Sequence, residues 1–333
     1  MGVIAIAANP ASGRDIRRLV SHATVYDNRE KANIVERIIL AAYQMGHHTS
    51  CIMPDSYGFG VRINRRLVED LLELPPEAIV IPELTTMDSQ TDTTQFARYA
   101  EERGCKVLVV LGGDGTSRAA AKGVQEIPVI PLSTGTNNAY PDMVEGTIAG
   151  MAASALADGV VSPEQCCQKS KRIEVYRNGE LVDIALIDAV FCPIVYSGAK
   201  AIWERDEILQ VVVTQCHPAS IGFSALLGGL VTVSPEDDFG AAAKSTTGEP
   251  NVRAAIGAGV ISGFRMEAQS LVPLNQPLHY EMPYSGMVAL DGEREVPYRK
   301  GDTITLVLTR NGPNRVNIRR ALSLAQRAGY FKT

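Results

Sequence analysis

Residues 107–111 read Val-Leu-Val-Val-Leu and lead directly into the sequence Gly-Gly-Asp-Gly-Thr at residues 112–116. A run of this length without a polar residue is typical of a strand in the middle of a parallel sheet, where helices cover both faces. The residues that follow, 116–124, have a helical pattern. In open parallel sheets, ligands collect at the carboxyl ends of the strands. The sequence therefore predicts a buried strand whose carboxyl end faces a ligand site.

The glycines of this segment suit a phosphate group. Gly112, Gly113 and Gly115 are predicted to let the backbone approach a ligand closely and to adopt positive φ. The following helix would offer its first N–H groups and its positive dipole end, with Thr116 or Ser117 as its cap. A carboxylate at the position of Asp114 could accept a proton from a hydroxyl or orient a metal ion. The other interpretation is an ordinary strand–turn–helix connection in which the aspartate is incidental.

The first half of the chain alternates strand-like and helix-like segments. This alternation predicts an α/β fold with an open, mostly parallel sheet that helices cover on both faces. The predicted strands are residues 3–8, 48–53, 78–81, 107–111 and 128–132, and the predicted helices are residues 31–45, 64–74, 92–103 and 116–124.

The composition changes between residues 158 and 172, where polar and turn-forming residues gather. Beyond this point the pattern is β-rich, and Asn178-Gly179 between two strand-like runs predicts a hairpin. Residues 317–328 return to a helical pattern. We therefore expect an α/β nucleotide-binding domain over residues 1–160, a β-rich domain over 170–310, and a C-terminal segment, 311–333, that returns to the first domain.

Bulk composition excludes several classes of protein. The chain has 333 residues, 45% of them hydrophobic and 21% charged, which is typical of a globular protein. Its net charge of -5 and the absence of a basic block argue against a nucleic-acid partner. No apolar stretch approaches the roughly 20 residues that span a membrane. Six cysteines without a C-x-x-C pair indicate reduced thiols and a cytoplasmic location.

The motif at residues 112–116 resembles the signature of the NAD kinase/diacylglycerol kinase superfamily, and within it the chain is most similar to the acetoin catabolism protein X group. Four further segments resemble that superfamily and occur in the right order. They are Asn9–Gly13, Ser133–Asn138, Ser220–Ser224 with the following Gly228-Gly229, and Leu290–Glu293. The resemblance thus covers nearly the whole chain, and it implies an NAD kinase-like α/β domain, a β-rich C-terminal domain and a cleft between them.

The resemblance also implies roles for individual residues. Asp114 takes the place of the catalytic aspartate, and Glu293 matches an acidic residue near the transfer site of the lipid-kinase branch, although Asp291-Gly292 also reads as a plain hairpin turn. ATP bound with Mg²⁺ is the expected donor and NAD the default acceptor; no residue is expected to hold a metal ion by itself. The residues expected to line the nucleotide or substrate are Asn9, Ser12, Gly13, Arg14, Gly112, Gly113, Gly115, Thr116, Thr134, Gly135, Asn137, Asn138, Asp188 and Ser220.

The chain departs from NAD kinases in two places. Ile187-Asp188 stands where these enzymes carry an Asn-Glu pair that helps to hold the dinucleotide, and Ile221 replaces a threonine. A kinase acting on a small molecule remains the leading hypothesis, and a non-catalytic nucleotide-binding sensor, or accessory protein of acetoin catabolism, is the alternative. A dinucleotide-binding G-x-G-x-x-G is excluded because Arg118 stands at its last position, and no Gly-Lys-Ser/Thr of a P-loop occurs. By analogy, a homo-oligomer is expected.

Overall fold

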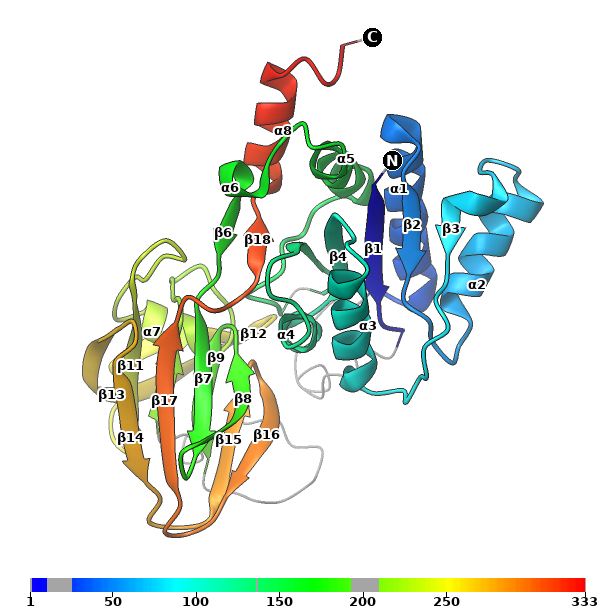
Figure 1. Ribbon diagram of the computed structural model, residues 1–333. Coiled ribbons are helices and arrows are strands. Elements are labelled where there is room, and N and C mark those ends of the chain that lie inside the picture. The colour runs from blue at the N-terminus through cyan, green and yellow to red at the C-terminus, as the bar shows by residue number, and fades with distance from the viewer. Residues whose placement is uncertain (1, 11–25, 136, 193–209, 333) are drawn as a thin grey trace.

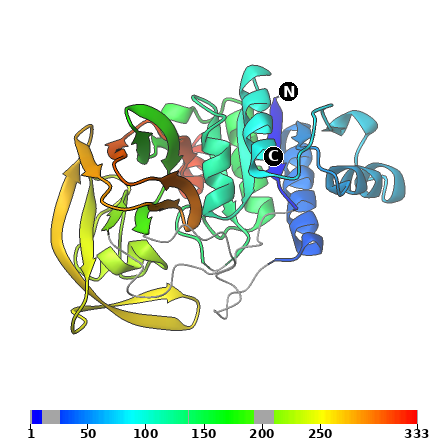
Figure 2. The same cartoon turned by 90° about the horizontal axis from the view of Figure 1, so that it is seen from below.

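The computed structural model of the 333-residue chain describes residues 2–10, 26–135, 137–192 and 210–332. Figure 1 shows an α/β part that carries the N-terminus and a strand-rich part below it, and Figure 2 shows the same two parts side by side. The α/β fold and the β-rich C-terminal region that the sequence predicts are both confirmed.

The α/β part is built on a seven-stranded sheet with the order β3-β2-β1-β4-β5-β18-β6. Its first five strands pair in parallel, and the register places Ala5 beside Leu108 and Leu108 beside Val129. The last two positions come from distant segments: β18 pairs with β5 in parallel, and β6 closes the edge in the antiparallel sense. The strands are β1 (Val3–Ala8), β2 (Thr49–Ile52), β3 (Ile79–Val80), β4 (Val107–Gly112), β5 (Pro128–Ser133), β6 (Cys167–Lys169) and β18 (Asn314–Val316).

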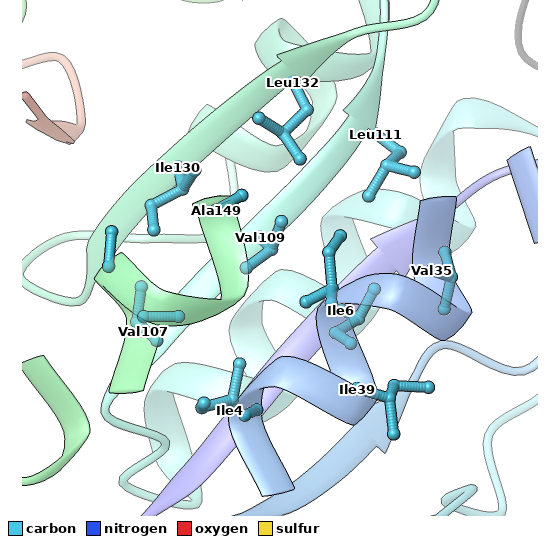
Figure 3. Close-up of a cluster of buried hydrophobic side chains, with 14 of the residues drawn as sticks. Ile4, Ile6, Val35, Ile39, Val107, Val109, Leu111, Ile130, Leu132 and Ala149 are labelled. Carbon is cyan, nitrogen blue, oxygen red and sulfur yellow. The ribbon is translucent and has the colours of Figure 1, made fainter. Parts of the chain in front are cut away.

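Helices cover both faces of this sheet. Successive side chains of a strand point to opposite faces, so each buried strand contributes apolar side chains to both. Ile4 and Ile6 of β1 pack with α1 and α5 on one face, where Val107 and Val109 of β4 join them (Figure 3). Alternate residues of the same two strands, including Ala5, pack with α3 and α4 on the other face. The covering helices are α1 (Asn28–Gly46), α3 (Gln90–Glu102), α4 (Asp114–Ala121), α5 (Gly146–Ala157) and α8 (Ile318–Arg327).

Helix α8 lies next to α5 (red in Figure 1) and contributes Ile318, Ala321 and Ala325 to the same core as β1 and β4. Its bounds agree with the predicted helix, since Asn317 is its N-cap and Ala328 its C-cap. The predicted domain bounds themselves stay a prediction. Among the described residues, no helix combines the length and the apolar character that crossing a bilayer requires.

The strand-rich part consists of two antiparallel sheets that pack face to face. One has the order β12-β13-β11-β10-β9-β15-β16 and the other β14-β17-β7-β8. Apolar side chains from both sheets, among them Phe191 and Leu306, form the core between them. The strands are β7 (Arg172–Arg177), β8 (Glu180–Ala185), β9 (Asp188–Cys192), β10 (Gln210–Val213), β11 (Phe239–Thr246), β12 (Val252–Gly257), β13 (Val260–Pro273), β14 (Pro277–Glu281), β15 (Gly286–Leu290), β16 (Glu293–Tyr298) and β17 (Thr303–Thr309).

Short helical elements complete the fold. Two of them replace the predicted helix 64–74, because the helical segment begins five residues earlier and continues with a wider π-helical turn. The hairpin predicted at Asn178-Gly179 is confirmed: both residues have positive φ, of 53° and 88°, between β7 and β8. The short elements are α2 (Phe59–Asn64), a π-helix (Arg65–Asp70), a 3₁₀ helix (Pro76–Ala78), α6 (Pro163–Cys166) and α7 (Phe223–Gly228).

Candidate functional site

Three neighbouring strands end at one edge of the α/β sheet. Because β1, β4 and β5 lie side by side and run parallel, their carboxyl ends bring Asn9, Gly112–Gly113 and Thr134 to this edge. The amide of Thr134 donates to the carbonyl of Gly112 over 3.2 Å, which joins the two loops. A cavity of about 260 Å³ opens here, lined by Leu111, Ser133 and Thr134 together with residues of α1 and of the turn before α5. Ser12, Gly13 and Arg14, also predicted to line the nucleotide, lie outside the described residues.

Asp114 is the first residue of α4 and is buried. Its carboxylate accepts hydrogen bonds from the amide of Ala139, at 3.0 and 3.1 Å, and from the amide of Tyr140, at 2.8 Å. These bonds fasten the loop after β5 to the start of α4. Ala139 and Tyr140 pack in turn against Ile187 and neighbouring residues of the strand-rich part. Asp114 therefore lies where the two parts of the molecule meet.

The start of α4 differs from the expected geometry. The helix begins at Asp114 rather than Thr116, and its N-cap is Gly113, so the prediction that Thr116 or Ser117 caps it is wrong. The Ser117 hydroxyl instead donates to the carbonyl of Gly113 over 3.1 Å. Within the residues that the structure describes, no side chain caps α4, whereas α1, α3, α5 and α8 are capped by Asp27, Ser89, Glu145 and Asn317.

The three glycines of the motif are needed for close packing rather than for positive φ. None of them has left-handed backbone torsions, so that expectation is wrong. A Cβ at Gly112 would lie 2.4 Å from the Thr116 hydroxyl, and one at Gly113 would lie 2.7 Å from Oδ1 of Asn138. A Cβ at Gly115 would lie 2.5 Å from the Glu293 carboxylate. The glycines thus admit three polar side chains to the first turn of α4.

The two asparagines predicted to contact a ribose or phosphate hold the loop in place. Asn138 donates to the Ser133 hydroxyl at 2.7 Å and to the Gly135 carbonyl at 3.2 Å. Oδ1 of Asn137 accepts from the amide of Ala258, at 3.2 Å, in the turn between β12 and β13. Their predicted contacts with a ligand stay a prediction.

Asp188 and Ser220 both belong to the strand-rich part. Asp188 is buried at the start of β9, and its backbone exchanges hydrogen bonds with Asp291, whose carboxylate accepts at 3.2 Å and whose amide donates at 3.0 Å. Ser220 is half-buried, and its amide donates to the His217 carbonyl over 2.9 Å in the turn before α7. Their predicted roles in substrate binding stay predictions.

A buried arginine that sequence reasoning missed lies one turn after Asp114. The Arg118 guanidinium is fully buried and faces four carboxylates. Burial alone would lower the pKa of Arg118, but the four acidic groups outweigh it and raise that pKa above its ordinary value. The carboxylates and their distances are Glu295 at 2.7 Å, Glu293 at 3.0 Å, Asp183 at 3.5 Å and Asp291 at 3.9 Å.

The turn at Asp291-Gly292 closes a hairpin, and its aspartate also binds backbone amides of a neighbouring segment. Both residues have positive φ, of 51° and 79°, as the turn between β15 and β16 requires. The Asp291 carboxylate also accepts from the amides of Leu186, Ile187 and Asp188 at 2.8–3.2 Å. The turn thereby presents Glu293 to the first turn of α4, where Gln90 and Arg118 donate to its carboxylate.

Comparison with known proteins identifies the same two parts. Residues 19–160 match the ATP-NAD kinase N-terminal domain, and residues 171–311 match the acetoin catabolism protein X C-terminal domain. The chain is 35% identical to acetoin catabolism protein X of Cupriavidus necator (strain H16) over 324 residues, covering 92% of this chain and 87% of that one.

Two solved structures resemble this chain to different degrees, and the first of them shows the same fold. Yeast NADH kinase complexed with NADH superposes with a TM-score of 0.55 at 14% identity, covering all of this chain and 89% of the other. A putative diacylglycerol kinase from Bacillus anthracis str. Sterne matches with a TM-score of 0.46 at 12% identity, covering 95% and 97% of the two chains. The sequence identity over nearly the whole of both chains leads to one conclusion: the chain belongs to the acetoin catabolism protein X family, with an ATP-NAD kinase-type domain in its α/β part.

Proposed function

We propose that this protein binds a nucleoside triphosphate at the carboxyl ends of β1, β4 and β5 and transfers its terminal phosphoryl group to a hydroxyl of a small molecule. The uncapped start of α4 carries this proposal. An α-helix leaves its first N–H groups without intrahelical acceptors, and a phosphate is the ligand that such a helix end favours. Among the α-helices of eight or more residues in the described chain, α4 alone lacks a side-chain cap, and it begins at the sheet edge where a ligand is expected.

Two carboxylates at this helix end favour a phosphate that arrives with a cation. Asp114 and Glu293 both adjoin the first turn of α4, and they would repel a bare triphosphate. Mg²⁺ is commonly held by one or two carboxylates together with substrate phosphates, so these residues fit a magnesium nucleotide. When bound, the ion would neutralise charge on the phosphates. Asp114 would position the acceptor hydroxyl and take its proton, and Glu293, which adjoins the same helix turn, would be an accessory acid.

NAD is the acceptor that we propose first. The α/β part matches the ATP-NAD kinase domain, and a structure of this fold is known from an enzyme described as an NADH kinase. Asp188 at the start of β9 and Ser220 before α7 would contribute polar contacts to the acceptor from the strand-rich side. The protein would act in the cytoplasm as a homo-oligomer.

One observation favours a second candidate, a nucleotide-binding protein without catalysis. Both carboxylate oxygens of Asp114 accept backbone N–H bonds from the loop after β5. A carboxylate used in this way stabilises a loop. In a sensor or accessory protein of acetoin catabolism, Asp114 would need only this structural role.

A coupled assay of ADP release, run on the full chain with NAD as the first of several acceptors, tests the proposal. Asp114→Asn is expected to lower turnover by several orders of magnitude while nucleotide binding, measured by calorimetry, persists. Asp92→Asn is the matched control, since Asp92 is also a buried carboxylate in the first turn of a helix and accepts from the amide of Met87 at 2.8 Å. Equal turnover in wild type and Asp114→Asn would remove Asp114 from the reaction. Tight nucleotide binding without turnover on any acceptor would favour the sensor.

A further inference from the structure

A second cavity, of about 790 Å³, is lined in part by Tyr140, the residue whose amide donates to Asp114. It opens where β6, β18 and the start of α8 meet the strand-rich part, and its lining includes Tyr140, Gln215 and Arg315. The volume falls in the range of small-molecule sites. Ser133, Thr134 and the α1 residues that line the smaller cavity are not among its lining residues, although Met143 and Val144 line both cavities.

The charges around this cavity favour an anion. Lys171, Arg315 and Arg319 line it, against the carboxylates of Asp142 and Glu236. Asp142 pairs with Nη2 of Arg315 at 2.8 Å and its side chain is 57% exposed, while Glu236 is exposed and hydrogen-bonded to Ser234. Three cations thus oppose two carboxylates that face solvent.

Arg315 supplies the most specific feature. Its guanidinium lies over the Tyr140 ring, 5.2 Å from the ring centroid, in a cation–π contact. Its Nε is buried and has no hydrogen-bond partner within the part of the chain that the structure describes. A buried N–H donor without an acceptor costs about 1–3 kcal/mol. The Arg315 side chain is 21% exposed, and its flat guanidinium suits a carboxylate or phosphate.

The start of α8 adds donors to the same wall. Ile318 and Arg319 are its first two residues and both line the cavity. The Asn317 side chain accepts from the amide of Arg320 at 2.9 Å, so it caps only one N–H of the first turn. The helix therefore presents its positive end and the Arg319 side chain to the cavity that Arg315 also lines.

Apolar side chains also contribute to the wall, among them Ile148, Leu186 and Leu322. We infer that this cavity is a second ligand site, which binds a small organic anion whose carboxylate or phosphate group contacts Arg315 and Arg319 and whose apolar part packs on Ile148 and Leu322. The inference that an anion binds here does not rest on the proposed nucleotide site.

Occupancy of this site is coupled to Asp114 through Tyr140. The Tyr140 ring contacts Arg315, its hydroxyl lies 2.9 Å from that of Ser170, and its amide donates to Asp114. Gln215, another lining residue, donates to the carbonyl of Ala139 at 3.3 Å. An anion that shifts Arg315 therefore changes the loop that holds Asp114, and by linkage anion and nucleotide change each other's affinity by the same factor. This coupling, unlike the binding, rests on the proposed function.

Titration calorimetry of the full-length protein with butyrate and with monobutyl phosphate tests the site and distinguishes the two anions. At least one probe is expected to bind wild type. Arg315→Gln and Arg319→Gln should each weaken that binding by about tenfold or more, as loss of one charge-assisted hydrogen bond implies. Arg103→Gln is the matched control, because Arg103 also lies over a tyrosine ring, at 5.3 Å from the centroid of Tyr99, and is not among the residues lining this cavity.

Thr134→Val separates this inference from the proposed nucleotide site, since Thr134 lines the smaller cavity at the strand ends. The inference predicts that Thr134→Val leaves probe binding unchanged. If Thr134→Val weakens it and the two arginine variants do not, the probe occupies the glycine loops, and the second site is wrong although the nucleotide site is supported. Failure of both probes to bind wild type, or equal affinity in Arg315→Gln, Arg319→Gln and wild type, also overturns it.

Discussion

Arg118 and Asp291 face each other across the junction of the two parts of the molecule, both fully buried, with Nε and Oδ2 3.9 Å apart. Arg118 belongs to α4, the helix that begins with Asp114, and Asp291 belongs to the turn that presents Glu293. The same charge cluster that joins the two parts therefore also sets the position of both candidate catalytic carboxylates.

Replacing Arg118 by methionine is expected to destabilise the protein strongly. The change leaves Asp291 and its neighbours as buried carboxylates without their cation, a loss that usually costs about 3–5 kcal/mol. Lys122→Met is the control, because Lys122 pairs with Asp183 at 2.6 Å but is partly exposed, and such pairs contribute about 1 kcal/mol or less. Urea unfolding of the three proteins measures the difference. Similar losses for both variants would show that the Arg118 cluster contributes no more than a surface pair.

Gly115→Ala should displace the Glu293 carboxylate, since the new Cβ would lie 2.5 Å from it. We expect only a small loss of stability, because the clashing atoms are the far end of the flexible Glu293 side chain, and lower turnover if the kinase proposal holds. The double variant Gly115→Ala, Glu293→Ala removes the clashing group, so it should regain stability relative to Gly115→Ala without regaining activity. If the second substitution instead adds its own loss of stability, the two side chains do not compete for the same space.

Lys171 is expected to make stability depend on pH. Its side chain is buried and donates to the carbonyls of Ser234 and Phe239, and burial lowers the pKa of Lys171 to about 8. Between pH 8 and the ordinary lysine pKa, the unfolded chain binds more protons at this residue than the folded chain does. This residue's contribution to the free energy of unfolding therefore rises with pH across that window, by at most about 1.4 kcal/mol per pH unit.

Buried thiols make the free energy of unfolding fall with pH over the same window, because burial raises the pKa of Cys216 to about 11 and that of Cys51 to about 12. The measurement is therefore a difference: the unfolding free energy of wild type minus that of Lys171→Met, at pH 7.5, 8.5 and 9.5. This difference should increase with pH. A difference that stays constant would mean that Lys171 has the same pKa in the folded and unfolded chain.

Ile6→Ala in β1 tests the core that supports the strand ends (Figure 3). Ile6 is fully buried between two neighbouring strands, and truncation of such a residue usually costs about 2–5 kcal/mol. Ile261→Ala in β13 is the matched control, since 74% of that residue is exposed and its truncation should change stability by about 0.5 kcal/mol or less. Thermal unfolding distinguishes them, and equal shifts of Tm would contradict the assignment of Ile6 to the core.

The sequence predicted the elements whose local pattern is strong. The apolar run at residues 107–111 became the central strand β4, and the amphipathic segment after Asn317 became α8. The sequence did not predict elements whose local preference is weak. Strand β11 contains Ala241, Ala242 and Ala243, which have little strand propensity, and it is a strand because β10 and β13 supply hydrogen-bond partners on both sides.

The sequence by itself determined that a glycine-flanked aspartate follows a buried strand. The apolar run of the strand, the glycines and the start of the helix are all specified by residues that are neighbours in the chain. Only the tertiary structure decided what surrounds Asp114. The amides that bind its carboxylate come from the loop after β5, and the partners of Arg118 come from β8, the β15–β16 turn and β16. Contacts of this kind join residues far apart in the chain, and they form only when burial removes water from the junction and makes each charge require a partner.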